Sequence, residues 1–193
     1  MMSAQPPVRD RILASATTLF DATSIRSVSA DKVIADAGTT KVTFYRHFPT
    51  KDHLVVAYLE DQLARLQAAI GRERADGLDA CTVLLHLAAA NGDAACRPGF
   101  RGCTFINAAA EYPADGMVRT AVGRYRAWLH AVVAELLAEL GVGRPDAVAD
   151  QLIMLRDGAM VYGFMGDPSA VTDSLVTAGR AIVAAHLDAP LSA

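Results

Sequence analysis

The sequence lacks the features that mark a membrane-spanning or secreted protein. No apolar run reaches the roughly 18 residues that a spanning helix needs. The first residues, "MMSAQPPVRDR", contain no apolar core and no cleavage pattern, so we expect no membrane span and no signal peptide. The 193 residues include three cysteines, Cys81, Cys96 and Cys103. Three thiols cannot form a closed set of disulfides, and we therefore expect reduced thiols in a cytoplasmic protein.

Motifs of catalysis and metal binding are also missing. The sequence shows no His-rich metal spacing, no Ser-His-Asp set and no glycine-rich phosphate loop, and we predict no metal and no cofactor. The strongest opposing pattern is Asn107 and Glu111, four residues apart on one helix face, which with Asp157 or His86 could form an acid–base site. Because a lone carboxylate in such a helix is more often an acceptor for a nearby arginine, we predict that the protein is not an enzyme.

What the sequence does contain is a helical pattern from end to end. The chain is 52% hydrophobic and 20% charged, so it has enough apolar side chains to form a core. Apolar residues recur at steps of three and four, with no sustained alternation of the kind that strands show. We predict an all-α protein of about nine helices, over residues 8–22, 30–37, 40–48, 51–74, 79–91, 103–112, 118–136, 146–165 and 170–187.

The charges are distributed unevenly along the chain. Residues 1–53 carry seven Lys and Arg against five Asp, a net charge of +2, whereas the remainder carries 11 basic and 16 acidic residues, a net charge of −5. The first quarter is therefore the part with an electrostatic preference for a polyanion.

The two short predicted helices over residues 30–37 and 40–48 have the arrangement of a helix-turn-helix, because the turn between them contains Gly38. In that motif the second helix enters the major groove and presents its first residues to the bases. Phe44 and Phe48 lie one turn apart and should anchor that helix in the core. Lysine can donate to guanine, and threonine and valine can contact a thymine methyl group. We predict base contacts from Lys41, Val42 and Thr43, and phosphate contacts from Thr40, Tyr45, His47 and Lys51.

The stretch "AGTTKVTFYRHFPTK", residues 37–51, together with "RILASATTLF" before it, resembles the TetR family of bacterial transcription regulators. The resemblance runs from about Arg11 to Leu54. It implies a homodimer in which residues 1–50 form a three-helix DNA-binding domain and residues 51–193 form a helical ligand-binding and dimerisation domain. It also adds Ser29 to the residues that contact phosphate.

One acidic residue departs from what a DNA-binding surface needs. Asp31, early in the predicted helix over residues 30–37, would repel phosphate unless a neighbouring cation neutralises it. We expect it to pair locally, with Lys32 or with Arg26.

The larger part of the chain offers a ligand pocket and a dimer interface. Aromatic and apolar residues with a few polar ones suit a pocket, although apolar stripes at helical spacing are core positions first. The predicted pocket residues are His86, Phe100, Phe105, Asn107, Tyr125, Trp128, Met154 and Tyr162. Helices over residues 146–165 and 170–187 carry apolar and small residues that would allow two copies to pair. The alternative is that these faces pack on the helix over residues 51–74, and the family resemblance favours the dimer. The predicted interface residues are Leu155, Gly158, Val171, Leu175, Ala178 and Ile182.

These patterns predict a ligand-responsive, DNA-binding transcriptional regulator. We expect a homodimeric repressor that a small apolar or amphipathic effector releases from palindromic double-stranded operator DNA. One alternative is a redox-sensing regulator that uses Cys96 and Cys103, because Arg97 and Arg101 nearby favour a reactive thiolate. Two others, from a different class, are a helical small-molecule-binding protein and an enzyme, neither with a function on DNA.

Overall fold

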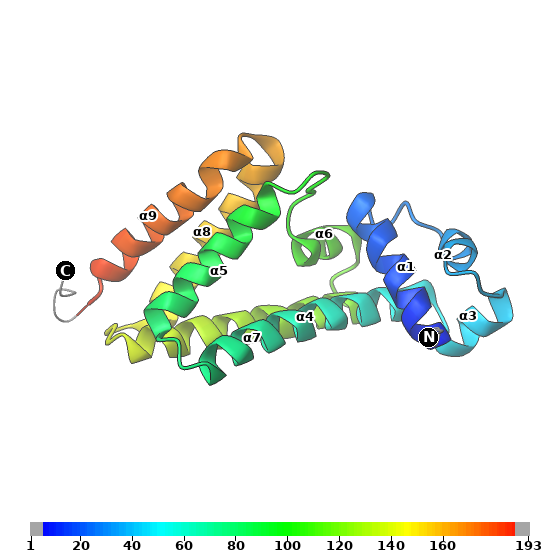
Figure 1. Cartoon of the computed structure of the whole chain (residues 1–193), viewed down its shortest axis with the longest axis horizontal. Helices are drawn as coiled ribbons and strands as arrows, with labels where there is room; N and C mark the ends of the chain where they lie inside the picture. Colours follow the sequence, from blue (N-terminus) through cyan, green and yellow to red (C-terminus); the bar gives the residue numbers. More distant parts are fainter. Residues whose placement is uncertain (1–5, 188–193) are drawn as a thin grey trace, which may run out of the picture. The chain divides into compact units, whose positions relative to one another are not determined.

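Figure 1 shows a computed structural model of the protein, which describes residues 6–187. The described residues contain no strand, only one isolated bridge between Val142 and Leu187, and the predicted all-α fold is confirmed. The helices are α1 (Val8–Ala22), α2 (Ala30–Asp36), α3 (Lys41–His47), α4 (Lys51–Ala75), α5 (Ala80–Ala95), α6 (Thr104–Glu111), α7 (Met117–Glu139), α8 (Pro145–Met165) and α9 (Val171–Ala184), with a 3₁₀ turn, η1 (Pro168–Ala170), before α9.

The predicted helix ends are close to the observed ones, with the largest difference in α5. We expect that helix to stop at Asn91, and it continues to Ala95. Gly92 is buried inside it, and a Cβ placed there would lie 1.6 Å from Oγ1 of Thr172. The glycine therefore serves a close approach of α9 to α5. Tertiary packing has overridden the tendency of an Asn-Gly pair to end a helix.

The chain forms two compact units that do not follow the order of the sequence. The first contains the described residues up to Ala64 together with residues 104–123, and the second contains residues 65–103 and the described residues from Arg124 onward. Helices α4 and α7 each contribute to both units. This division concerns packing. The functional division into residues 1–50 and 51–193 remains a prediction. The outermost residues of these two parts, 1–5 and 188–193, lie outside the described range.

The core of the first unit joins α1, α2 and α3 to the start of α4. Ile12, Phe20, Val33 and Phe44 are all buried in it. Tyr58 of α4 places its ring edge-on against Phe20, with centroids 5.3 Å apart, and its hydroxyl group donates a hydrogen bond to the carboxylate of Asp21. Burial of these aromatic and aliphatic side chains fixes the three short helices, which could not be stable alone.

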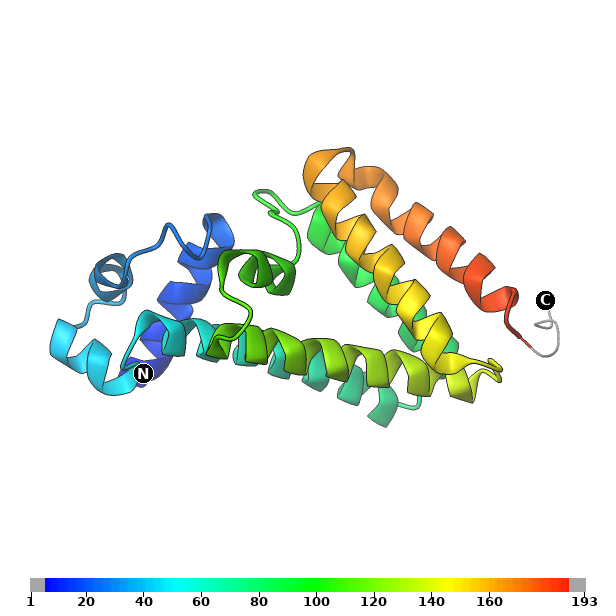
Figure 2. The ribbon, with the colours of Figure 1, turned by 180° about the vertical axis from the view of Figure 1, so that it is seen from behind.

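The second unit is a bundle built around α5, α8 and α9, which lie side by side in Figures 1 and 2. The end of α4 and most of α7 complete it. There, Ile70, Val83 and Leu136 form a buried cluster from three helices. Arg74 and Glu139 join α4 to α7 through a two-pronged ion pair with N–O distances of 2.7 and 2.8 Å. The bundle is the part of the molecule with room for a cavity.

Candidate functional site

The helix-turn-helix is set up by two capping residues and a glycine. The side chain of Ser29 accepts a hydrogen bond from the backbone N–H of Lys32 at the start of α2, and Thr40 does the same for Thr43 at the start of α3. Both caps satisfy N–H groups that have no partner within the helix. Gly38, in the turn, has a φ of +58°, a left-handed conformation that glycine adopts without strain. The sequence thus fixes where each helix starts and how sharply the chain turns.

Helix α3 is anchored on its inner side by two phenylalanines. Phe44 is fully buried and Phe48 nearly so, with ring centroids 6.0 Å apart. The guanidinium of Arg9 lies 5.4 Å from the ring centre of Phe48, a cation–π contact. On the neighbouring helix, Ser15 donates a 2.6 Å hydrogen bond to Asp36 and so joins α1 to α2. Because the inner side of α3 is held this firmly, its outer side has a fixed orientation.

The outer side of α3 exposes apolar and aromatic residues of the kind that folded proteins usually bury. Val42 is 80% exposed and Tyr45 is 40% exposed, beside the exposed ammonium group of Lys41. Thr43 is half-buried, and its hydroxyl group accepts a hydrogen bond from Thr40. An apolar side chain, an aromatic hydroxyl and a cation on one short helix make a surface suited to base edges and phosphates.

The predicted pairing of Asp31 is wrong. Its carboxylate lies 3.3 Å from Nζ of Lys41, across the turn, and not against Lys32 or Arg26. The α2–turn–α3 geometry brings the first turns of both helices together, which places Lys41 nearer than the residue that follows Asp31 in sequence. Both side chains are largely exposed, so the pair contributes little stability. It does hold the lysine that we predict to contact a base.

The predicted phosphate-contacting residues do not all have free hydrogen-bonding groups. Ser29 caps α2 through an acceptor lone pair, which leaves its hydroxyl hydrogen for a phosphate. Tyr45 is exposed and His47 is half-buried. Lys51, in contrast, donates from Nζ to the carbonyl groups of Ile25 at 2.7 Å and Arg26 at 3.2 Å. Burial lowers its pKa from the usual value. Its main contacts are with the turn after α1.

The same turn is held from a second side by α6. The carboxylate of Glu111 accepts a 2.6 Å hydrogen bond from the backbone N–H of Arg26. Tyr112, next to it, is half-buried, and burial raises its pKa to about 12. Glu111 therefore serves as a backbone acceptor in the first unit. Asp157, the other carboxylate of the acid–base alternative, pairs with Arg126 and Arg156 in the second unit.

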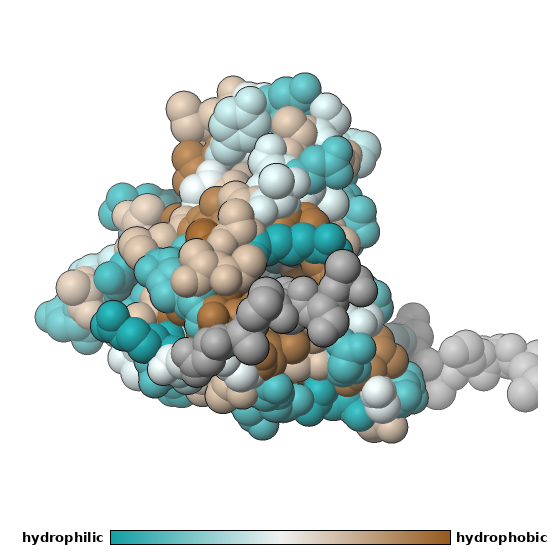
Figure 3. Space-filling view, turned by 90° about the vertical axis from the view of Figure 1, so that its left-hand side faces the viewer, coloured by the Kyte–Doolittle hydropathy of each residue, from teal (hydrophilic) through white to brown (hydrophobic). Residues whose placement is uncertain are grey.

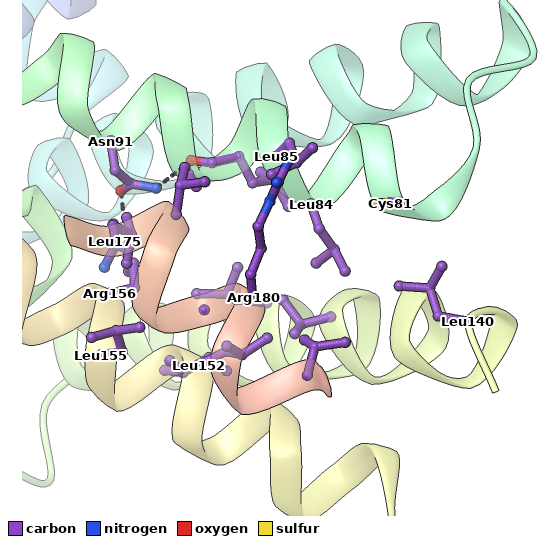
Figure 4. Close-up of a pocket in the computed structure, with 18 residues that line it drawn as sticks. Cys81, Leu84, Leu85, Asn91, Leu140, Leu152, Leu155, Arg156, Leu175 and Arg180 are labelled. Atoms are coloured by element: carbon purple, nitrogen blue, oxygen red, sulfur yellow. Dashed lines mark hydrogen bonds between the residues drawn. The ribbon is translucent and has the colours of Figure 1, made fainter. Parts of the chain in front are cut away.

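The second unit contains a cavity of about 160 Å³ between α5, α7, α8 and α9 (Figure 4). Most of its wall is aliphatic, and its polar residues are Asn91, Arg156, Arg180 and the thiol of Cys81. The lining residues are Cys81, Leu84, Leu85, Leu87, Ala88, Asn91, Leu129, Val133, Leu140, Leu152, Ile153, Leu155, Arg156, Leu175, Val176, Gly179, Arg180 and Val183. An apolar enclosure with a few polar groups is the usual form of a small-molecule site.

None of the eight predicted pocket residues lines this cavity, so the prediction does not hold for it. Phe105 and Tyr125 are buried elsewhere, and Trp128 packs on the cluster of Ile70 and Val83. The remainder are half-buried or exposed: His86, Phe100, Asn107, Met154 and Tyr162. The prediction places aromatic side chains in the pocket, whereas leucines and valines form most of the cavity wall. These residues read in the sequence as ordinary core positions.

The sequence patterns predicted none of the four polar residues of the cavity, Cys81, Asn91, Arg156 and Arg180. Arg156 donates to Oδ1 of Asn91 at 3.1 Å, to Sγ of Cys103 at 3.3 Å and to Asp157 at 2.9 Å. Its partners lie on α5, before α6 and on α8, so no spacing in the sequence connects them. The surrounding acceptors raise the pKa of Arg156 above its ordinary value, and the guanidinium is charged at every physiological pH.

The predicted dimer residues divide into two groups. Leu155 is half-buried and lines the cavity, and its interface role remains a prediction. Val171 and Leu175 are buried within the protomer, so these two are wrong as interface residues. They face inward because α9 packs against both α5 and α8. Gly158 is exposed, and Ala178 and Ile182 are half-buried. Figure 3 shows hydrophobic residues among polar ones on the face where α9 ends.

An apolar stripe does run along the outer face of α8. Met154, Val161, Tyr162 and Met165 are all exposed large hydrophobic residues, Met165 at 79%. Together with Gly158 they recur at helical spacing and so lie on one side of the helix. Single exposed hydrophobic residues are normal, whereas a contiguous stripe is typical of an interaction surface.

The thiols of the redox alternative have separate partners. Cys96 is exposed and its Sγ lies 3.5 Å from the carbonyl oxygen of Pro168, whereas Cys103 is buried and its Sγ accepts from Arg156. Nothing in these contacts tests a thiol switch, which remains a prediction. Among residues 6–187, no group of three or more His, Cys, Asp or Glu side chains could hold a metal ion. No helix in that range is long and apolar enough to cross a membrane.

The chain matches known proteins over its amino-terminal segment and over most of its length. Residues 12–58 match the family model of bacterial regulatory proteins of the tetR family. The crystal structure of a TetR-family transcriptional regulator from Streptomyces coelicolor is 37% identical in sequence, with a TM-score of 0.86, over 93% of this chain and 95% of that one. Escherichia coli NemR in its reduced form shares the fold, with a TM-score of 0.76 at 20% identity, over 96% of this chain and 100% of that one.

A further match is more distant. The nucleoid occlusion factor SlmA from Shewanella loihica is 28% identical over 91 residues, which is 45% of this chain and 46% of that protein. The chain thus spans about half the length of the curated relatives that it matches.

Proposed function

The chain belongs to the TetR family of transcriptional regulators, and from that premise we propose that it is a homodimeric repressor which a small-molecule effector releases from DNA. We assign DNA binding to residues 1–50, and ligand binding and dimerisation to residues 51–193. We place the protein in the cytoplasm. The observation that carries the proposal is the division of α3: Phe44 and Phe48 are buried, whereas Lys41, Val42 and Tyr45 are presented to solvent.

We assign the reading of bases to the first turn of α3. Lys41 donates to a guanine, Val42 packs on a thymine methyl group and Thr43 supports that turn. Ser29, Tyr45 and His47 contact phosphates and so fix the register of the helix in the groove. Thr40 contacts a phosphate by exchanging the hydrogen bond that its hydroxyl group donates to Thr43. Lys51 contributes indirectly, because it holds the turn after α1 through the carbonyl groups of Ile25 and Arg26.

We assign the homodimer interface to the outer stripe of α8 with the outer side of α9. Met154, Gly158, Val161, Tyr162 and Met165 supply the apolar surface. Ala178 and Ile182 of α9 keep their predicted role beside them. A two-fold axis places the same stripe of each copy against its partner, so one apolar surface is buried against itself. The two α3 helices then contact successive major grooves, roughly 34–36 Å apart, on a palindromic site.

The cavity of the second unit supplies the response to an effector. A bound molecule must prefer the conformation in which the two α3 helices no longer match the groove spacing. A preference of a few kcal/mol is enough to change operator occupancy substantially.

The test is binding of the full chain to DNA sites that it has selected from a random library, against scrambled DNA, across a salt series. We expect selective binding with two protomers per site and an affinity that falls steeply with salt. Tyr45→Ala should weaken binding to every sequence by about fivefold per half-site, the effect of one phosphate hydrogen bond. Leu66→Ala, an exposed hydrophobic residue of α4, is the control and should change nothing.

Two results would contradict the proposal. Recovery of no sequence from the library would leave a helical binding protein without a DNA function. Equal affinities of Tyr45→Ala and the parent chain would place the DNA surface elsewhere.

For the interface, Met165→Asp should give a monomer by sedimentation, whereas Met117→Asp, at an exposed methionine of α7, should leave the dimer intact. A dimer that survives Met165→Asp would remove α8 from the interface.

A further inference from the structure

The chemistry of the cavity in the second unit selects among small molecules. Its 18 lining residues include two arginines and no aspartate or glutamate. The remaining wall is aliphatic, apart from Asn91 and Cys81. Such a wall favours a hydrocarbon, and the surplus of positive charge disfavours any cation.

The two arginines are not equivalent. Arg156 is half-buried and already donates to Asn91, Cys103 and Asp157. Asn91 in turn uses its amide group to donate to the carbonyl oxygen of Leu87. This network is satisfied without a ligand, so it has a structural role in the cavity wall.

The surroundings of Arg180 differ from those of Arg156. Within the described residues, no carboxylate or other acceptor forms a hydrogen bond or ion pair with its guanidinium. The side chain is exposed overall, yet it lines the cavity. In Figure 4 it extends from α9 toward α5, above the aliphatic residues of the cavity. It is also the only basic residue of α9.

We propose that this cavity binds an amphipathic anion, a straight-chain carboxylate whose tail fills the aliphatic part and whose headgroup pairs with Arg180. The inference deepens the proposed function, since it names the chemical class of the effector for the same cavity. A guanidinium forms two parallel hydrogen bonds with a carboxylate and leaves the headgroup at the rim, where it stays partly hydrated. The tail then needs no polar partner.

Tail length provides a first quantitative expectation. Each methylene removed from water strengthens binding by about fourfold, until the cavity of about 160 Å³ is filled. Across the series from hexanoate to dodecanoate, affinity should therefore rise steeply and then level off. A rise that never levels would indicate adsorption to the surface.

The experiment is calorimetric titration of the purified full chain, without DNA, with octanoate and with its neutral and cationic counterparts, octanol and octylamine, below their micellar concentrations. We expect octanoate to bind more tightly than octanol by about tenfold, and octylamine to bind least. Arg180→Gln should remove the advantage of octanoate over octanol, and Arg180→Lys should restore part of it. A headgroup preference that is unchanged in Arg180→Gln would overturn the assignment.

A second variant tests the position of the tail. Gly179 lines the cavity, and a Cβ there would lie 3.7 Å from Cδ2 of Leu152, an ordinary contact. Gly71→Leu, at a glycine of α4 where a Cβ meets nothing within 4 Å, is the control that should bind as the parent does. Gly179→Leu puts a larger side chain into the same cavity and should weaken octanoate and octanol alike. Circular dichroism confirms that each variant is folded. Unchanged binding in a folded Gly179→Leu protein would place the ligand outside the cavity.

The failure of this inference and the failure of the proposed function give different results. DNA release is measured separately, with the selected site and saturating octanoate. Binding of octanoate through Arg180 without DNA release would keep the ligand class and contradict the effector role. Release of DNA by octanol, equally in Arg180→Gln, would keep the regulator and overturn the anionic ligand.

Discussion

The two candidate sites of this protein are built in opposite ways. The outer face of α3 is a set of exposed side chains from one seven-residue helix, fixed from behind by two buried phenylalanines. The cavity of the second unit takes its wall from four helices that are up to about a hundred positions apart in sequence, with an arginine at an aliphatic wall. The first site depends on local spacing, and the second depends on packing. A single substitution should therefore affect the two sites in different ways.

The largest expected effect is the difference in stability between replacing a buried residue of α3 and replacing an exposed one. Phe44 is fully buried and Tyr45, the next residue, is 40% exposed. Phe44→Ala should lower the free energy of unfolding by about 3–5 kcal/mol, through lost burial and a residual cavity. Tyr45→Ala should lower it by less than about 1 kcal/mol. Urea unfolding measures both, and similar losses for the two variants would mean that α3 is not oriented as described.

The next effect is a loss of stability at alkaline pH in the second unit. Burial raises the pKa of Tyr125 to about 12. The folded state then holds a proton that the unfolded state loses near pH 10. The contribution of Tyr125 to the free energy of unfolding is therefore fully present below pH 10 and is lost as the pH rises to 12. Tyr125 should account for about 2–3 kcal/mol of that fall.

Tyr125→Phe, compared with the parent protein by urea unfolding at successive pH values, isolates this contribution. The variant should lose less stability than the parent between pH 10 and 12. Equal losses of stability in the two proteins over this pH range would show that Tyr125 is not desolvated.

A smaller effect distinguishes packing from helix propensity. Gly92→Ala should destabilise the protein by about 1–3 kcal/mol, because its Cβ would overlap the side chain of Thr172. Gly71→Ala in α4, where a Cβ meets nothing within 4 Å, should stabilise it by about 0.5–1 kcal/mol. Thermal unfolding of both variants gives the sign of each change. Two changes of the same sign would contradict the close approach of α9 to α5.

The comparison also explains how far the sequence predicts the structure. Helices depend on local spacing, so the sequence predicts their approximate number and most of their ends. It also predicts that α3 buries Phe44 and exposes Val42. The cavity was not readable, because Leu152 and Val176 look like any core residue until four helices are assembled. Arg180 did carry a signal, as a lone cation in an otherwise apolar stretch of α9. Asp31 was misassigned because its partner Lys41 lies across a turn, ten residues away.

The smallest effect concerns that exposed pair. Asp31→Asn removes a negative charge near the DNA and releases Lys41, so DNA affinity should rise by up to about fivefold for every sequence. Asp173→Asn, which makes the same charge change at an exposed position of α9, should have no such effect. Fluorescence anisotropy at two salt concentrations checks both variants. A gain confined to one DNA sequence would mean that Asp31 itself reads a base.

The most direct test of DNA recognition by α3 replaces single thymines by uracil in the selected site, which removes only the C5-methyl group. We predict one position per half-site at which uracil weakens binding of the parent chain by about fivefold, but leaves Val42→Ala unaffected. Such coupling would place Val42 in the major groove against that methyl group. Equal losses for the parent and Val42→Ala at every position would contradict recognition by the exposed face of α3.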